Sequence, residues 1–495
     1  MIKTRFAPSP TGYLHIGGLR TALYCYLFAK KNKGKFVLRI EDTDQERYID
    51  GAKENLIETL EWIGLHWDEG PTKEKGQIGD HGPYIQSERT DIYKKHIDQL
   101  LESGHAYRCF CPKERLDEMR EKQKARKEAT MYDRKCCDLP ESEVKAKMDT
   151  GDPYVIRQKM PYETIKFKDI VRGSVQFDGK TIDDQILVKS DGFPTYHFAN
   201  VIDDHLMKIT HVIRGEEWLP STPKHIHLYR AFGWEEPEFA HLPLLLNPDK
   251  TKLSKRQGHV AVEEYIKEGY LADAIINFAV FLGWNPGGGE ENEIFTLKEL
   301  EDTFSLEKVH KSGAVFNIEK LDWFNWKWRK SNLEKKESKG EKTKSELLLE
   351  ICEDYVSDEH KKDKEFLLKT LSTVEEKILK NPKEINDNIS FFFKLPDYKK
   401  ELLTHEKMHV DLNQAKASLE ASLESLKNLE KWEEEEIKET LLKTVEKLEV
   451  KNGQIFWPLR AALTGLEFSP GVFEASWALG KEETLKRINI ALEKL

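Results

Sequence analysis

The sequence predicts a multidomain α/β protein in which a parallel-sheet domain is interrupted by an insertion and followed by helical domains. Three observations favour this class. The chain has 495 residues, too many for one hydrophobic core, so we expect about three to five domains. Residues 2–40 show the pattern of a strand, a helix and a second strand, which is a βαβ unit. From residue 331 onward the pattern is helical and dense in Leu, Lys and Glu.

The first βαβ unit begins close to the N-terminus. A strand is expected at 2–7, where apolar and polar side chains alternate, and a segment rich in Pro at 8–12 ends it. Apolar residues then recur every three or four positions over 15–31, the period of a helix, and a second strand is expected at 36–40. Because a parallel sheet carries its site at the carboxyl ends of its strands, the loop before the helix is a candidate site.

The chain divides into regions that differ in pattern. Short β-like runs that follow a very polar helix indicate an inserted α/β domain, and a Lys/Glu-rich linker or solvated helix is expected at 331–350. The predicted regions are 1–90 and 192–250 for a discontinuous Rossmann-type domain, 91–191 for the insertion, 251–330 for a helical domain, and 331–495 for a second helical domain whose two parts meet near 405–420.

Composition restricts the function classes. A net charge of −10 argues against a protein that coats nucleic acid indiscriminately, although it allows a local basic groove. The N-terminus has no apolar signal region, and no apolar run approaches the roughly 18 residues of a membrane helix, so we expect a cytoplasmic protein. The six cysteines include Cys109, Cys111 and the adjacent Cys136 and Cys137, which in a reducing compartment indicate metal ligands or buried thiols.

The first motif that carries chemistry is the helix start at His15, Ile16, Gly17 and Gly18. A helix N-terminus presents unpaired N–H groups that attract phosphate, and the glycines let a base or ribose lie against the backbone. His15 can donate a hydrogen bond to a phosphate oxygen. The alternative is that His15 only caps the helix.

The second motif is the segment KLSKR at 252–256. Lys252 and Lys255 stand three positions apart after a turn and before Gly258, and a lysine ammonium is a mobile point charge for phosphate. Taken alone, the segment favours a solvated basic turn. Together with the helix start, it indicates a site that stabilises charge on a transferring phosphate.

Four further segments appear in order between these motifs and around them. They are 5–12 (RFAPSPTG), 39–44 (RIEDTD), 196–205 (YHFANVIDDH) and 212–218 (VIRGEEW). With the two motifs, they resemble the class I aminoacyl-tRNA synthetases and, within that class, the bacterial glutamyl-tRNA synthetase family. The resemblance runs the whole length, since 458–465 (PLRAALTG) and 469–471 (SPG) are similar to that family's anticodon-binding region. The general class pattern often has His where Gly18 stands and Ser where Arg256 stands, and both departures occur within the glutamyl branch.

This resemblance implies a fold and an activity. The fold is a Rossmann-type class I synthetase catalytic domain with an α/β acceptor-stem-binding insertion, followed by all-helical stem-contact and anticodon-binding domains. The activity is ATP-dependent ligation of L-glutamate to tRNA(Glu), through a glutamyl-adenylate and transfer to the 2′-hydroxyl of the terminal adenosine. ATP is then a substrate, Mg²⁺ bridges its phosphates, and the family suggests a monomer with no membrane partner.

The predicted site residues divide by ligand. Those with a catalytic role are His15, Lys252 and Lys255, which face the α-phosphate and the leaving pyrophosphate. Those for ATP are Gly17, Gly18, Glu217, Trp218, Leu253 and Lys255. Those for glutamate are Arg5, Ala7, Ser9, Glu41, Tyr196, Asn200 and Arg214. Those for the anticodon are Arg460, Ser469 and Pro470.

Charge assigns the glutamate contacts more closely. Arg5 and Arg214 are candidates for the γ-carboxylate because a guanidinium binds a carboxylate bidentately, and Glu41 for the α-ammonium. The alternative for each is structural, since strand-end arginines and carboxylates commonly pair with each other and Tyr196 suits an ordinary core.

The cysteine spacing resembles the zinc knuckle that some glutamyl enzymes carry in this insertion. Zinc takes four ligands, and the pattern assigns Cys109, Cys111, Cys136 and Asp138. Cys137 and Tyr132 are alternatives for the fourth position. The other interpretation is a group of buried, reduced thiols.

Four other functions compete with this one. A non-discriminating enzyme would also charge tRNA(Gln). A glutaminyl-tRNA synthetase would have a β-barrel C-terminal half, and a short tRNA-modifying paralogue would lack the anticodon domain. A non-catalytic RNA-binding homologue is disfavoured by His15, Lys252 and Lys255. The tryptophans at 323, 326 and 328 favour a domain-junction core over an RNA-stacking platform.

Overall fold

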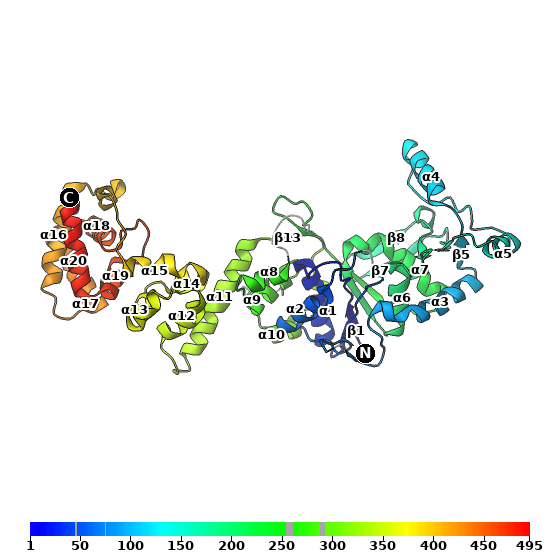
Figure 1. The fold of residues 1–495 in the computed structure, drawn as a ribbon, viewed down its shortest axis with the longest axis horizontal. Coiled ribbons are helices and arrows are strands. Elements are labelled where there is room, and N and C mark those ends of the chain that lie inside the picture. The colour runs from blue at the N-terminus through cyan, green and yellow to red at the C-terminus, as the bar shows by residue number, and fades with distance from the viewer. Residues whose placement is uncertain (45–46, 75, 254–260, 288–292) are drawn as a thin grey trace. The chain divides into compact units, whose positions relative to one another are not determined.

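A computed structural model describes the chain except residues 45–46, 75, 254–260 and 288–292 (Figure 1). The described residues form two units, 1–325 and 326–495. Lys255, Arg256 and Gly258 of the predicted lysine segment lie outside the described residues.

A six-stranded sheet organises the first unit. Its strand order is β2-β1-β10-β11-β7-β8. The strands are β1 (Lys3–Phe6), β2 (Lys35–Leu38), β7 (Ile165–Asp169), β8 (Gly173–Phe177), β10 (His211–Gly215) and β11 (Glu238–Leu242). All neighbours are parallel except β7 and β8, which are antiparallel. The chain therefore leaves the sheet after β2 and returns much later, which confirms the discontinuous Rossmann-type fold.

Helices flank this sheet and position its loops. The helix α1 (Ile16–Lys31) packs on β1 and has His15 as its N-cap, as the apolar period predicts. The remaining helices around the sheet are α2 (Ala52–Trp62), α3 (Thr90–Glu102), α6 (Tyr196–Leu206) and α7 (Thr222–Ala231). A 3₁₀ segment, η3 (Glu216–Ser221), links β10 to α7.

The segment predicted as an insertion contributes to two sheets. Three of its strands form an antiparallel sheet of their own, in the order β5 (Ala106–Cys109), β6 (Val155–Gln158) and β9 (Ile186–Val188). Two others, β7 and β8, extend the six-stranded sheet instead. The helices α4 (Lys113–Ala125) and α5 (Glu141–Asp149) bury no residue. The domain boundaries themselves stay predictions.

The end of the first unit is largely helical. The helices are α8 (Val262–Lys267), α9 (Ala272–Phe281), α10 (Leu297–Thr303) and the start of α11 (Ile318–Glu337). The apolar helix α9 packs against α1, and the hydroxyl of Tyr24 on α1 donates to the carbonyl of Val280 at 2.9 Å. A short parallel pair of strands, β12 (Leu245–Leu246) and β13 (Ala314–Val315), connects this helical region to the segment that follows β11.

The second unit is described without gaps and contains helices and 3₁₀ turns but no strand. Its α-helices after α11 are α12 (Lys344–Cys352), α13 (Lys364–Ser372), α14 (Glu375–Lys380), α15 (Ile385–Phe393), α16 (Leu412–Lys427), α17 (Glu434–Lys447), α18 (Asn452–Thr464), α19 (Val472–Leu479) and α20 (Lys481–Lys494). One hydrophobic core runs from Leu333 to Ala491. Trp328 is buried and Trp326 packs against this core, which supports the core interpretation of both.

A buried arginine ties three helices of the second unit together. Arg487 on α20 is 1% exposed, and its guanidinium donates to the carbonyls of Phe391 and Phe392 on α15 and of Leu463 on α18, at 2.7 to 2.9 Å. Glu483, one turn earlier, pairs with its Nε at 2.9 Å. Within the described part of the chain, none of the helices combines the length and apolar character that a membrane span requires.

Candidate active site

A cavity of about 1210 Å³ lies where β1 and β10 end and α1 begins, in the position that the βαβ pattern predicts. It brings together most of the residues predicted for ATP and glutamate. These are Arg5, Ala7, Ser9, His15, Gly17, Gly18, Glu41, Tyr196, Arg214, Glu217, Trp218, Lys252 and Leu253. Asn200 is buried on α6 and is not among the described lining residues.

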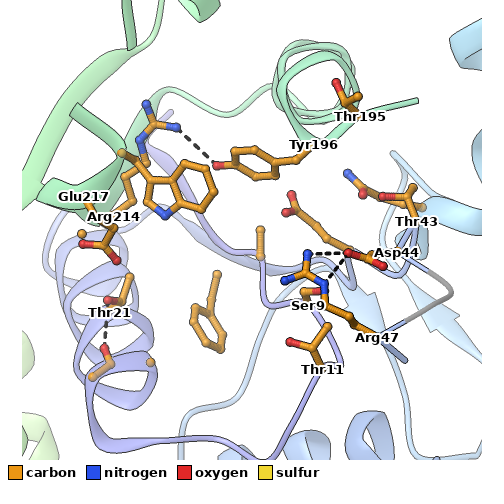
Figure 2. A pocket seen from close by; sticks show the side chains of 18 of the residues that line it. Ser9, Thr11, Thr21, Thr43, Asp44, Arg47, Thr195, Tyr196, Arg214 and Glu217 are labelled. Carbon is orange, nitrogen blue, oxygen red and sulfur yellow. Dashed lines mark hydrogen bonds and ion pairs between the residues drawn. The ribbon is translucent and has the colours of Figure 1, made fainter. Parts of the chain in front are cut away.

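Sequence reasoning missed several polar residues of the cavity wall. They include Thr11, Arg20, Thr21, Thr43, Asp44, Arg47, Gln86, Lys189, Asp191 and Thr195. Thr11, Thr43 and Asp44 stand inside the segments 5–12 and 39–44, so the motif text contained a signal for them. Figure 2 shows Arg47 turned toward Asp44, with which it forms an ion pair. Arg20 on α1 donates to the carbonyls of Leu282 and Pro243, and these hydrogen bonds connect α1 to the segments that follow α9 and β11.

His15 caps α1, as the alternative interpretation expects. Its Nδ1 accepts a hydrogen bond from the backbone N–H of Gly18 at 3.1 Å. A neutral imidazole that accepts at Nδ1 carries its proton on Nε2, so the capping geometry defines a donor tautomer. At Gly17 a Cβ atom would stand 3.1 Å from the His15 ring, a tight contact that favours glycine at this position. Capping and phosphate binding are therefore compatible in His15.

Arg5 lies in a network of buried charges. Its Nε donates to Asp204 Oδ1 at 3.1 Å, and the same carboxylate accepts from Arg39 Nη1 at 2.7 Å. Arg39 also donates to Glu41 through Nη2 at 2.9 Å. Arg5 therefore has the carboxylate partner that the structural alternative expects, and it also lines the cavity.

Glu41 is the carboxylate of this network that lines the cavity. Burial raises the pKa of its side chain to about 7, although the neighbouring Arg39 favours the ionised form. A carboxylate with this pKa is poised to change its charge near neutral pH. It suits the α-ammonium group predicted for it.

Arg214, at the end of β10, differs from Arg5 in its partners. Its Nη1 donates to the hydroxyl of Tyr196 at 3.3 Å, which Figure 2 shows, and to Nδ1 of His225 at 3.2 Å. Its Nη2 donates to the hydroxyl of Thr222 at 2.9 Å, and its Nε to Nε2 of His241 at 3.2 Å. The described residues place no carboxylate in an ion pair with it.

Other residues predicted to contact ATP also line the cavity. Trp218 on η3 packs against Tyr196 with 4.4 Å between the ring centroids. Leu253 is held by a hydrogen bond from its backbone N–H to the carbonyl of Leu245 at 2.9 Å, and Lys252 beside it is exposed. The exposed ammonium is available to a charged ligand in the cavity, whose wall Lys252 helps to form.

Three predicted metal ligands gather in the insertion. The sulfur atoms of Cys109, Cys111 and Cys136 lie within 4.8 Å of one another, and Cys111 and Cys136 are 3.6 Å apart. Two thiolates on one tetrahedral zinc stand about 3.8 Å apart, so the spacing fits this ion. The hydroxyl of Tyr132 lies 3.3 Å from two of these sulfurs. Asp138 is instead exposed and pairs with Lys159 at 3.5 Å.

The predicted anticodon residues lie together in the second unit. Arg460 on α18 stacks over Trp457 at 4.8 Å from the ring centroid, and its Nη1 donates to Ser469 Oγ at 3.4 Å. Ser469 in turn donates to the carbonyl of Pro470 at 3.2 Å. The neighbouring Phe468 is 82% exposed, so this loop presents an aromatic ring beside a cation.

Comparison with known proteins agrees with this geometry. The family model for the catalytic domain of class I tRNA synthetases (E and Q) matches residues 1–323, and a model of an anticodon binding domain matches 346–492. Together with the Rossmann-type sheet, these matches identify the chain as a class I aminoacyl-tRNA synthetase. The glutamate–tRNA ligases of Chloroherpeton thalassium and Alkaliphilus metalliredigens are 47% and 46% identical, each over 100% of this chain, and the alignments cover 98% and 99% of those proteins. The chain belongs to the glutamate–tRNA ligase family.

Solved structures lead to the same assignment. A crystal structure of a glutamate tRNA ligase from Elizabethkingia meningosepticum, in complex with its amino acid, has a TM-score of 0.83 at 41% identity and covers 100% of this chain. A glutamate-tRNA synthetase from Elizabethkingia anophelis has a TM-score of 0.81 at 40% identity over 99% of this chain. The all-helical second unit also disagrees with the β-barrel expected of a glutaminyl enzyme.

Proposed function

We propose that this protein ligates L-glutamate to tRNA(Glu) in two steps, with the site residues in the roles given below. One observation carries the proposal: a single cavity is lined by the helix start at His15, by the buried carboxylate of Glu41 and by the buried guanidinium of Arg214, which pairs with no carboxylate of the described residues. These charges complement the γ-carboxylate and the α-ammonium of glutamate.

In the first step the α-carboxylate of glutamate attacks the α-phosphorus of ATP, and pyrophosphate leaves. No protein nucleophile takes part, so the protein contributes position and charge. The N-terminus of α1 and His15 bind the α-phosphate, while Lys252 and Lys255 balance the charge that develops on pyrophosphate. Mg²⁺ bound to the phosphates would supply further positive charge.

Arg214 and Tyr196 bind the γ-carboxylate in this proposal. A guanidinium has five N–H groups, and four of them have the partners described above. Among the described residues the fifth, on Nη2, has no partner, and in this proposal it binds the ligand. The hydroxyl of Tyr196 accepts from Arg214 and can donate its own proton to the second carboxylate oxygen. Glu41 binds the α-ammonium, and Arg5 keeps Asp204 and the strand end in place.

In the second step the terminal 2′-hydroxyl of the tRNA attacks the glutamyl carbonyl, and AMP leaves. We assign the acceptor end to the insertion and the anticodon to the loop around Arg460, Ser469 and Pro470. Aromatic and cationic groups at that loop suit unpaired bases. We expect the protein to act as a monomer and to be located in the cytoplasm.

The cysteine cluster is proposed to hold a structural zinc ion. Cys109, Cys111 and Cys136 supply three soft ligands, and the ion would fix the loop that carries them. For the fourth position, Tyr132 is adjacent to the sulfurs, whereas Asp138 would first have to leave Lys159.

Pyrophosphate exchange tests the central proposal. With glutamate, ATP and tRNA(Glu), we expect ATP–pyrophosphate exchange and formation of glutamyl-tRNA. If circular dichroism shows that the protein is folded and no exchange occurs under these conditions, ligase activity is refuted. Charging of purified tRNA(Gln) beside tRNA(Glu) decides whether the enzyme discriminates between the two.

A further inference from the structure

The guanidinium of Arg214 is surrounded by neutral acceptors although it is only 5% exposed. Its four hydrogen-bond partners are Tyr196, Thr222, His225 and His241, at 2.9 to 3.3 Å. A buried cation without a counter-ion costs considerable free energy, and folds usually compensate it with a carboxylate. Arg5, in the same cavity wall, is compensated in this way by Asp204. The different treatment of Arg214 indicates a counter-ion that arrives with the ligand.

Hydrogen bonds fix His241 in its neutral form. Arg214 is always a donor, so Nε2 of His241 must accept and the ring proton must be on Nδ1. That nitrogen lies 2.6 Å from Oδ2 of Asp169, to which it donates. Burial lowers the pKa of His241, which opposes a second proton. The carboxylate of Asp169 thus orients the ring while the ring separates it from the guanidinium.

The same reasoning applies to His225. Its Nδ1 accepts from Arg214, so its Nε2 carries the proton and donates to Nδ1 of His197 at 3.0 Å. Burial, reinforced by the charge of Arg214, holds the pKa of His225 well below its usual value. Burial also lowers the pKa of His197 to about 4. Both rings are neutral at the pH of the cell.

We propose that Tyr196, Thr222, His225 and His241 form a neutral shell that positions Arg214 and leaves its charge to be compensated by the substrate. The inference rests on the proposed function, in which Arg214 binds the γ-carboxylate of glutamate. Glutamine has nearly the same shape but carries no charge. In the pocket it would leave the buried cation uncompensated, and a site with an unpaired buried group rejects a ligand strongly. The shell residues beyond Tyr196 are therefore positioning residues that determine specificity.

A pair of variants that differ by one charge tests the shell. His225→Asp places a carboxylate beside Arg214, and His225→Asn has the same shape with a neutral acceptor. We expect His225→Asp to raise the KM for glutamate about 100-fold through loss of the free charge, and His225→Asn to raise it less than about fivefold. The measurements are aminoacylation of tRNA(Glu) at varied glutamate and inhibition by glutamine.

Inhibition by glutamine separates an effect on the charge of Arg214 from a structural disruption of the pocket. If the carboxylate acts only on the charge of Arg214, inhibition by glutamine is unchanged or stronger in His225→Asp, and kcat falls less than KM rises. A merely structural role predicts that both amino acids bind more weakly and that both variants are affected alike. Equal KM values for glutamate in the two variants overturn the inference.

A second pair covers the case in which His225→Asp does not fold. Thr222 is the first residue of α7, where a carboxylate is favoured by the helix N-terminus. Thr222→Asp is therefore expected to fold and to raise the KM for glutamate about 100-fold relative to Thr222→Asn. Arg214→Gln tests the role of Arg214 separately from the role of the neutral shell. If Arg214→Gln leaves the KM for glutamate unchanged, the proposed role of Arg214 fails. If it raises that KM while both charge pairs show no difference, only the neutral shell fails.

Discussion

Arg39 Nη2 donates to Glu41 Oε1 at 2.9 Å; both side chains are buried, and Glu41 lines the cavity. The arginine is shared, because its Nη1 also binds Asp204 at 2.7 Å. Glu41 consequently receives only part of the stabilisation that a dedicated cation would give. Burial prevails, and the pKa of Glu41 rises to about 7.

This pKa predicts a pH dependence of glutamate binding. Below about pH 7 Glu41 is protonated and loses its attraction for the α-ammonium, so the KM for glutamate should rise up to about tenfold for each pH unit lost. Above that pH the KM should be constant. The measurement is KM for glutamate between pH 5.5 and 8.5, with Glu41→Gln as the control. The variant should have a high KM without pH dependence; a parallel slope in both enzymes would assign the titration to another group.

Arg5→Ala and Arg214→Ala should differ in which property they change. Arg5 holds the buried Asp204, so its loss should lower the free energy of unfolding by about 2 kcal/mol in addition to impairing glutamate use. Arg214 has no carboxylate partner among the described residues, so its loss should mainly raise the KM for glutamate. Denaturant unfolding and steady-state kinetics measure the two effects. Equal stability losses would contradict the assignment of Arg5 to the framework.

The cysteine cluster predicts one zinc ion per chain. Cys111→Ser should remove the metal and raise the KM for tRNA more than the KM for ATP, because the cluster lies in the insertion. Tyr132→Phe and Asp138→Asn decide the fourth ligand by their metal content, measured by mass spectrometry of the native protein. Wild-type protein without metal after purification in the presence of zinc would support buried thiols instead.

Arg487→Met should destabilise the second unit. The change leaves three buried carbonyls without their donor, and we expect a loss of at least about 3 kcal/mol in the free energy of unfolding. Lys486→Met is the matched control. Lys486 is the residue before Arg487 and also pairs with Glu483, but its side chain is 67% exposed. A change within about 0.5 kcal/mol is expected there. Similar values for both variants would show that the buried contacts are not required.

Local pattern was sufficient for the start of the catalytic domain. The helical period over 15–31 and the flanking strands are set by neighbouring residues, and the structure has α1 between β1 and β2 as expected. The sequence motifs also predicted cavity residues: Arg5, Glu41 and Arg214 lie in separate motifs, and all three line the cavity.

Long-range pairing could not be obtained in this way. The strands β7 and β8 have the same local pattern as those of the small sheet, and only tertiary packing decides which sheet they join. The side-chain partners of Arg5 and Arg214 come from β11, α6 and α7, many of them far away along the chain. Asn200 belongs to a predicted motif but is buried on α6 and is not among the described residues that line the cavity. The sequence offered Tyr132 only as one of three candidates for the fourth metal ligand, and its position 3.3 Å from two cysteine sulfurs depends on the tertiary fold.

The return of β7 to the main sheet limits how the chain can be divided. Asp169 ends β7, within the residues predicted as an insertion, yet it is hydrogen-bonded to His241 on β11, which accepts from Arg214, the arginine proposed to bind the substrate. The segment 91–191 is therefore not an exchangeable module. A chimaera that receives the whole segment from a relative also receives the residue that orients His241, so under the proposed roles it exchanges part of the amino-acid pocket together with the acceptor-binding segment.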